Sequence, residues 1–176
     1  MKNKAYPNVL EYNNKIIPYT YKTNKYRMVK SIKIKSLACM NFKLKYRDEF
    51  YTPKLTIDNG RNNCQYEFKL YEKCLCNITA TSCWINGNYW WAKNCISSSA
   101  GWLSNTNVEN INTAYILFEF DPYINITSFG FSSWYDTSRY ANTSSIVDIT
   151  YITGEVITET IVTPIPTPVY YNIKDE

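Results

Sequence analysis

The sequence predicts an all-β protein, an antiparallel β-sandwich, on three observations. Phe, Trp and Tyr make up 16% of the 176 residues. These aromatic residues and the β-branched ones cluster in short runs that Asn, Ser, Thr and Asp separate, as in strands joined by polar turns. Within the runs, apolar and polar residues alternate, so each strand has one apolar face for a core. The length suits one core rather than two full domains.

The first predicted strands lie between residues 29 and 47. Ile32 and Ile34 alternate with lysines, and from Phe42 to Arg47 apolar residues alternate with Lys and Arg. Each strand therefore has one apolar and one basic face. We predict that the two strands form a hairpin that turns near residues 39–41.

Further strands follow a tight-turn signal. Asp58, an asparagine and Gly60 precede an alternating run that begins at Tyr66, which predicts a second hairpin. Apolar residues also alternate over residues 116–120 and 147–151, where we expect core strands.

Both ends of the chain are predicted to be extended arms. Residues 1–27 are rich in Asn, Lys and Tyr and follow no sustained period. Residues 163–168 place proline at every second position, which removes alternate backbone donors and predicts a proline-spaced tail over residues 163–176. The β-sandwich domain is expected to span residues 28–162.

Charge is divided unevenly along the chain. Residues 1–50 hold 12 Lys and Arg against 3 Asp and Glu, which makes them +9, although the whole chain is only +4. A basic segment can bind nucleic acid, an anionic membrane surface or an acidic protein. We favour a solvated lysine-rich strand face, and nucleic-acid binding through residues 1–50 stays open as an alternative.

The redox state expected for the cysteines depends on the compartment in which the protein is made. The N-terminus lacks the apolar stretch of a secretory signal, and no run approaches the roughly 18 apolar residues of a membrane span. We therefore expect synthesis in the cytoplasm, no membrane span, and cysteines that are free, largely buried thiols. The six are Cys39, Cys64, Cys74, Cys76, Cys83 and Cys95.

Metal binding and catalysis have little support in the residue types. Cys74 and Cys76 could join other cysteines around zinc, but the usual Cys-x2-Cys spacing is missing. Histidine is absent altogether, which excludes Ser-His-Asp and Cys-His catalysis. The carboxylates of Glu119, Asp121 and Asp136 leave a glycosidase as a third functional alternative. We predict no metal, no cofactor and no enzymatic activity.

Two loops supply the candidate ligand contacts. The stretch from Cys83 to Trp91 is the densest aromatic group, and aromatic faces stack on the C–H surfaces of sugars. The polar loop over residues 132–145 adds side chains that recognise hydroxyls and carboxylates. The candidates are Trp84, Tyr89, Trp90, Trp91, Trp134, Tyr135, Asp136, Arg139 and Asn142. The alternatives are tryptophans that plug the sandwich end or a subunit interface, and an ordinary solvated loop.

Four short motifs over residues 77–153 resemble the discoidin, or coagulation factor 5/8 type C, family of galactose-binding-like sandwiches. They are Ala80-Thr81-Ser82, Trp102-Leu103-Ser104, the strand Tyr115 to Phe120 and the strand Ile126 to Phe131. The resemblance implies a jelly-roll sandwich that binds carbohydrate, lipid headgroup or protein through loops at one end, without chemistry.

The chain also departs from that family in two places. Ser99 and Ala100 stand where the family has Asp-Gly ahead of the tryptophan, and this weakens the expectation of a calcium site. No cysteine follows Cys95, so the terminal cysteine pair of extracellular members has no counterpart.

A displayed sandwich with an arm at each end is typical of subunits that assemble with copies of themselves or with a scaffold. We expect a structural and binding subunit of a phage or other virus particle: a capsid decoration, a head fibre or a tail-associated adhesin. Its partners would be other copies or virion proteins, bound through the arms, and a cell-surface glycan. The alternative is a free-standing carbohydrate-binding module of a cell-surface or exported system.

Overall fold

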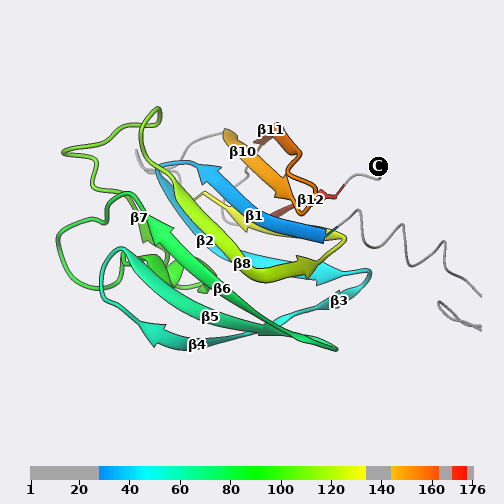
Figure 1. The fold of residues 1–176 in the computed structure, drawn as a ribbon. Coiled ribbons are helices and arrows are strands. Elements are labelled where there is room, and N and C mark those ends of the chain that lie inside the picture. Colours follow the sequence, from blue (N-terminus) through cyan, green and yellow to red (C-terminus); the bar gives the residue numbers. More distant parts are fainter. Residues whose placement is uncertain (1–27, 134–143, 163–167, 174–176) are drawn as a thin grey trace, which may run out of the picture.

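The computed structural model describes residues 28–133, 144–162 and 168–173, which contain twelve strands and one short 3-10 helix (Figure 1). The strands are β1 (Met28–Lys35), β2 (Ala38–Tyr46), β3 (Glu49–Phe50), β4 (Thr52–Asp58), β5 (Asn63–Lys69), β6 (Lys73–Ala80), β7 (Trp102–Leu103), β8 (Ile116–Asn125), β9 (Ser128–Ser132), β10 (Ser144–Tyr151), β11 (Val156–Val162) and β12 (Val169–Asn172). The helix, η1, spans Ala92–Ile96. Both predicted arms lie wholly or largely outside the described residues.

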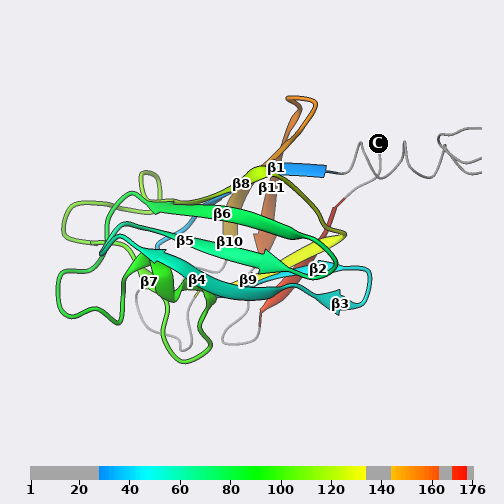
Figure 2. The same cartoon turned by 60° about the horizontal axis from the view of Figure 1, so that its bottom comes forward.

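The strands form a β-sandwich, which confirms the predicted fold class. The larger sheet has seven strands in the order β11-β10-β1-β8-β6-β5-β4. The smaller has five strands, with β12-β9-β2-β3 in order and β7 paired to β2. Neighbouring strands pair antiparallel throughout the described residues, and Figure 2 shows the smaller sheet lying across one face of the larger.

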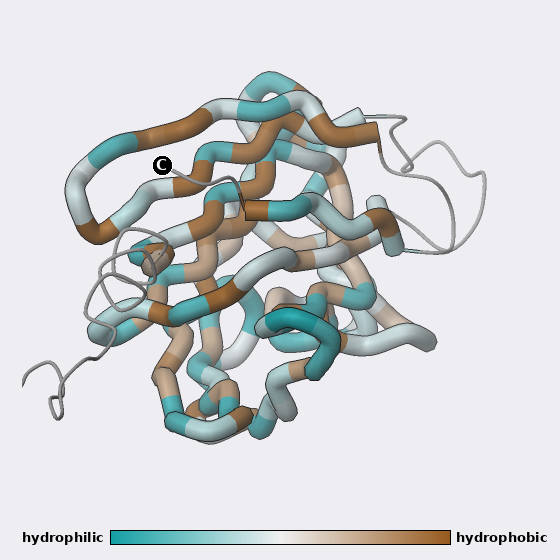
Figure 3. The backbone as a smooth tube through the Cα atoms, turned by 90° about the vertical axis from the view of Figure 1, so that its right-hand side faces the viewer, coloured by the Kyte–Doolittle hydropathy of each residue, from teal (hydrophilic) through white to brown (hydrophobic). Residues whose placement is uncertain are grey.

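Alternation along the strands builds the core between the two sheets. In β6, buried Cys74, Cys76 and Ile78 alternate with exposed neighbours. Figure 3 shows hydrophobic and hydrophilic residues following one another along the chain. At the centre, the rings of Phe42 in β2 and Phe118 in β8 stack with their centroids 3.8 Å apart and their planes 9° apart. This contact joins the two sheets.

The predicted hairpin between the first two strands is wrong. β1 lies in the larger sheet and β2 in the smaller, so residues 36–37 cross from one layer to the other. The apolar faces of both strands still point into the core, where Ile32, Ile34 and Leu44 are fully buried. Alternation marks which face of a strand is buried but not which sheet contains it, and a hairpin and a crossing have the same pattern.

The second predicted hairpin is confirmed. β4 and β5 pair antiparallel, with Asp58 opposite Cys64. In the turn, the Oδ1 atom of Asp58 accepts a hydrogen bond of 3.1 Å from the backbone N–H of Gly60. Gly60 has φ +92°, a left-handed conformation that a residue without Cβ adopts at little cost.

Part of the predicted tail belongs to the sandwich. Residues 169–172 form β12, which pairs with β9 at the edge of the smaller sheet. The ring of Tyr170 lies over Gly130 so closely that a Cβ at Gly130 would be 2.5 Å from two ring carbons. The run Val169-Tyr170-Tyr171 follows the last proline, and these β-formers can therefore pair where the preceding prolines cannot.

All six cysteines are free and buried, as predicted. Burial penalises the thiolate, and it raises the pKa of Cys64 to about 12 and the pKa values of Cys74 and Cys83 to about 11. The described residues contain no group of three or more His, Cys, Asp or Glu side chains placed to hold a metal ion.

Thiol burial leads to a pH prediction. A folded-state pKa above the ordinary 9.0 gives stability that is present below pH 9 and is lost as the pH rises toward the folded values. We expect the urea midpoint of unfolding to fall between about pH 9 and pH 11. At about pH 8, a thiol reagent should react with none of the six cysteines in the native protein and with all six in denaturant. Rapid labelling of the native protein would contradict the buried arrangement.

Candidate ligand-binding loops

Three described connections meet at one end of the sandwich: the β4–β5 turn, the β6–β7 connection and the β7–β8 connection (Figure 1). The aromatic loop predicted from sequence is the part of the β6–β7 connection from residue 83 to residue 91. Its shape depends on how its three tryptophans pack.

Trp84 and Trp90 anchor the loop to the sandwich. Both are partly buried and pack against Ala38 and Leu103, which form a small apolar cluster of their own. The backbones of the same residues are also hydrogen-bonded: Trp84 N donates to the Leu103 carbonyl at 2.8 Å, and Leu103 N donates to the Trp90 carbonyl at 3.2 Å. The loop is thereby paired to β7 on both sides.

Trp91 packs against the main core instead. Its indole Nε1 is buried and makes no hydrogen bond within the part of the chain that the structure describes. The Nζ atom of Lys93 lies 5.4 Å from the centre of the Trp91 ring and forms a 2.8 Å ion pair with Asp58. That hydrogen bond from Lys93 is the main reason why the pKa of Asp58 is lowered. The turn and the loop are thus tied together.

The tip of the loop, residues 85–89, is exposed to solvent. Tyr89 is 68% exposed and Ile85 is 50% exposed, and between them Gly87 has φ +81°, which turns the chain back. The Tyr89 ring lies 6.4 Å from the Trp90 ring at an angle of 57°. The Tyr89 ring therefore lies next to the partly buried Trp90 ring and is itself exposed to solvent.

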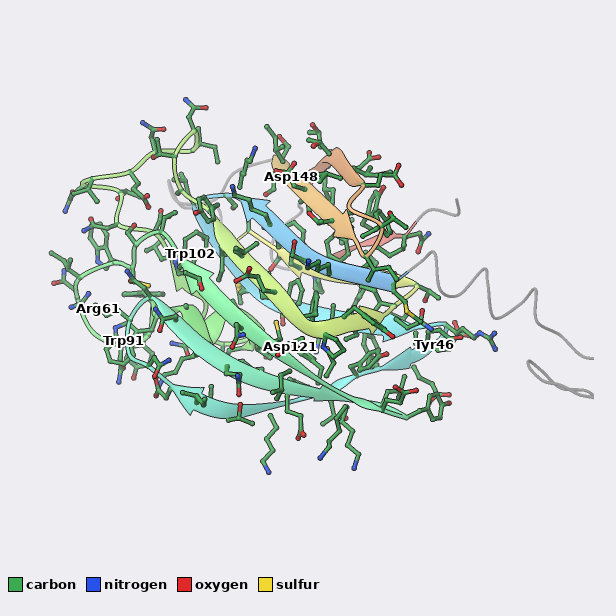
Figure 4. All side chains as sticks on the ribbon, viewed as in Figure 1. Tyr46, Arg61, Trp91, Trp102, Asp121 and Asp148 are labelled. Carbon is green, nitrogen blue, oxygen red and sulfur yellow. The ribbon has the colours of Figure 1, made fainter. Side chains whose placement is uncertain are left out.

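Arg61, just after the β4–β5 turn, holds this loop from the side, and sequence reasoning did not identify it. Its guanidinium donates to the carbonyls of Trp84 and Ile85 at 3.5 and 3.3 Å. Its own carbonyl accepts from Ala92 N at 2.9 Å and from the thiol of Cys83. Figure 4 shows Arg61 beside Trp91 at this end. Contacts between residues this far apart in sequence leave no local signal.

Glu109 fastens the β7–β8 connection to the start of the β6–β7 connection. The Oε1 atom of Glu109 accepts a hydrogen bond of 2.8 Å from the hydroxyl of Thr81 and another from the hydroxyl of Ser82. This connection exposes Val108 by 72% and Ile111 by 40%. Both loops therefore present apolar side chains at the same end of the sandwich.

We expect Glu109→Ala to lower the free energy of unfolding by about 2 kcal/mol, since two hydroxyls lose a charged acceptor. Limited proteolysis should then cut within residues 104–115 first, because that connection loses its tie to residues 81–82. Glu155→Ala, in an exposed turn, is the matched control and should change stability by less than about 0.5 kcal/mol. Equal proteolysis of both variants would contradict the role of Glu109.

Four of the nine predicted contact residues lie in the described part of the chain, and the structure brings them together in one loop. Trp84, Trp90 and Trp91 are used largely for packing, and Tyr89 is the exposed member. The other five, Trp134, Tyr135, Asp136, Arg139 and Asn142, lie outside the described residues. The prediction that these nine contact a ligand stays a prediction.

The carboxylates considered for glycoside cleavage are not part of this loop end. Glu119 and Asp121 are exposed and alternate with buried residues of β8, which places them on the outer face of the larger sheet. Asp136 lies outside the described residues.

Comparison of the chain with protein families, with curated protein sequences and with solved structures finds no match. Among the described residues, no helix is long and apolar enough to cross a membrane. The functional interpretation therefore depends on the residues of this chain alone.

Proposed function

We propose that the chain is a non-enzymatic structural and binding subunit of a large assembly, and that this assembly is a phage or other virus particle. It would serve as a capsid decoration, a head fibre or a tail-associated adhesin, assembled in the host cytoplasm and located in the virion. The binding part of the proposal rests chiefly on the loop tip, where Tyr89 is 68% exposed above packed tryptophans.

The chemistry of the loop tip suits a carbohydrate or a protein surface. The open face of Tyr89 offers an apolar platform with a hydroxyl at its edge. Asn86 and Asn88 flank it and are exposed, and amides both donate hydrogen bonds to hydroxyls and accept them. Because the loop is held by Arg61 and by β7, little conformational freedom is lost when a ligand binds.

Contacts within the motif region support the discoidin-like, jelly-roll part of the proposal. Trp102, from the second motif, is fully buried, and its Nε1 donates a 2.8 Å hydrogen bond to the carbonyl of Ser82 in the first. The hydroxyl of Ser82 accepts from Asn105 N at 2.9 Å. Two of the four motifs are thus in direct contact beside the loops that the resemblance assigns to a ligand.

The assembly part of the proposal assigns the partner contacts to residues 1–27 and 163–176. The partners are other copies of the chain or other virion proteins. Residues 1–50 carry the excess of positive charge, which suits an acidic protein surface.

Two experiments test the proposal. Light scattering during size-exclusion chromatography should show the full chain as an oligomer, and deletion of residues 1–27, which leaves β12 in place, should shift it toward a monomer. On a glycan array, Tyr89→Ala and Ile85→Ala should lose signal, whereas Tyr170→Ala, on the smaller sheet, should keep it. An arm-independent monomer that binds glycans would instead favour the free-standing carbohydrate-binding module.

A further inference from the structure

A cleft lies at the opposite end of the sandwich from the loops. It encloses about 410 Å³ and is lined by the four tyrosines Tyr46, Tyr51, Tyr71 and Tyr123, together with Glu72 and Lys73 among others. Figure 4 shows Tyr46 at one end of the molecule, with Arg61 and Trp91 at the other. The cleft therefore shares no residue with the site of the proposed function.

Two of the tyrosines are fixed in place by their hydroxyls. Tyr51 donates a 2.7 Å hydrogen bond to the carbonyl of Asn125, and Tyr71 donates a 2.7 Å hydrogen bond to Oε2 of Glu49. Tyr51 is partly buried, so its ring forms a wall whose position is set before any ligand arrives, whereas Tyr71 is 72% exposed at the rim.

The other two tyrosines have uncommitted hydroxyls. Within the described residues, neither Tyr46 nor Tyr123 makes a side-chain hydrogen bond, and Tyr123 is 40% exposed. The guanidinium of Arg47 lies 5.3 Å from the centre of the Tyr46 ring, which shows that one face of this ring is already used. The two free hydroxyls can each donate and accept one hydrogen bond to a ligand.

Charged groups complete the rim. Glu72 is exposed and offers a carboxylate acceptor, and the Nζ atom of Lys73 lies 3.5 Å from Glu67 with its side chain 65% exposed. The cleft thus combines aromatic faces, phenol hydroxyls and one charge of each sign.

We propose that this cleft binds a saccharide, at a site separate from the aromatic loop. Its volume lies within the range of small-molecule sites, about 300–1,000 Å³. Tyrosine faces pack against the C–H surfaces of a sugar ring, while phenol hydroxyls and a carboxylate bond its hydroxyls. All of these groups line one cleft.

Saturation-transfer NMR on the full chain tests this, with a pool of methyl glycosides of the common hexoses, N-acetylhexosamines and sialic acid as the probe. We expect transfer to the ring protons of at least one glycoside. Tyr46→Ala and Tyr123→Ala should each weaken its binding about tenfold, and Tyr123→Phe should weaken it less because the ring face remains. Tyr89→Ala, at the loop end, and Tyr170→Ala should leave this binding unchanged.

Four outcomes would overturn the cleft proposal. They are transfer to no glycoside, binding that survives both tyrosine replacements in folded protein, binding of every glycoside lost only in Tyr89→Ala, and displacement of the glycoside by a synthetic peptide of residues 1–27. The last would assign the cleft to residues 1–27 of the chain, which precede the lining residue Met28 in the sequence. Circular dichroism in the near ultraviolet confirms that each variant is folded. A glycoside whose binding is lost only in Tyr89→Ala is bound at the loops and supports the proposed function, so only glycosides whose binding survives in Tyr89→Ala report on the cleft.

Discussion

Replacing Trp102 with alanine is expected to lower the free energy of unfolding by about 3–5 kcal/mol. The side chain is fully buried, and β7, which carries it, pairs with β2 through Cys39. Its loss leaves a cavity, removes the Nε1 hydrogen bond to Ser82 and leaves that carbonyl without this donor. Equilibrium unfolding in guanidinium chloride measures the change.

Two companion variants separate these contributions. Trp102→Phe keeps most of the buried volume but not the hydrogen bond, so it should cost less than Trp102→Ala. Val108→Ala, at a side chain 72% exposed in the neighbouring connection, should change stability by less than about 0.5 kcal/mol. A Trp102→Ala variant as stable as Val108→Ala would mean that the tryptophan is not buried as described.

Replacing Phe118 with alanine is the second large expected effect, again about 3–5 kcal/mol. Phe118 is fully buried in β8, and its ring stacks on Phe42 across the core. The replacement removes one of the two stacked rings that join the sheets and leaves a cavity in its place. The loss should appear as a lower denaturant midpoint with an unchanged dependence on denaturant concentration.

Phe50→Ala is the matched control for Phe118→Ala, because the same side chain is 47% exposed there. A double-mutant cycle between Phe42→Leu and Phe118→Leu should give a coupling energy of about 0.5–1.5 kcal/mol for the stacked pair. Additive losses would indicate that the two rings do not touch.

These core variants also serve the functional tests. Trp102 lies beneath both exposed connections, so its replacement is expected to weaken ligand binding at the loops by loosening their support. Phe118 contributes to the centre of the core and to neither end. Binding that is lost in Trp102→Ala but kept in folded Phe118→Ala would link the loop end to its tryptophan anchor.

Local patterns were sufficient for several predictions. The alternation over residues 116–120 and 147–151 marks core strands because a strand has a period of two, whatever it pairs with. The turn at Gly60 was predictable because a tight turn is specified by a few consecutive residues, and glycine readily adopts the positive φ, here +92°, that this turn requires. Burial of the cysteines followed from their apolar character.

Contacts between distant segments were beyond reach of such patterns. The sequence left open whether the tryptophans of the aromatic loop form a ligand platform or plug the end of the sandwich. Trp84 and Trp90 pack on a small apolar cluster and Trp91 packs on the main core, which leaves Tyr89 as the exposed ring. Whether an aromatic residue is an anchor or a platform depends on what lies beneath it. The tyrosine cleft was not predicted from the sequence, because Tyr46 and Tyr123 lie far apart along the chain and line one cleft only in the folded protein.

Three properties could be predicted from the sequence alone: a sandwich of antiparallel strands, the absence of histidine chemistry and the burial of the thiols. These follow from composition and from the two-residue period, which each strand carries locally. Three other features became visible in the folded chain: the placement of β1 and β2 in opposite sheets, the bonds from Arg61 and Glu109 that fasten the loops, and the cleft that four tyrosines share. Strand pairing and packing join residues that are close in space, and no local pattern encodes that closeness.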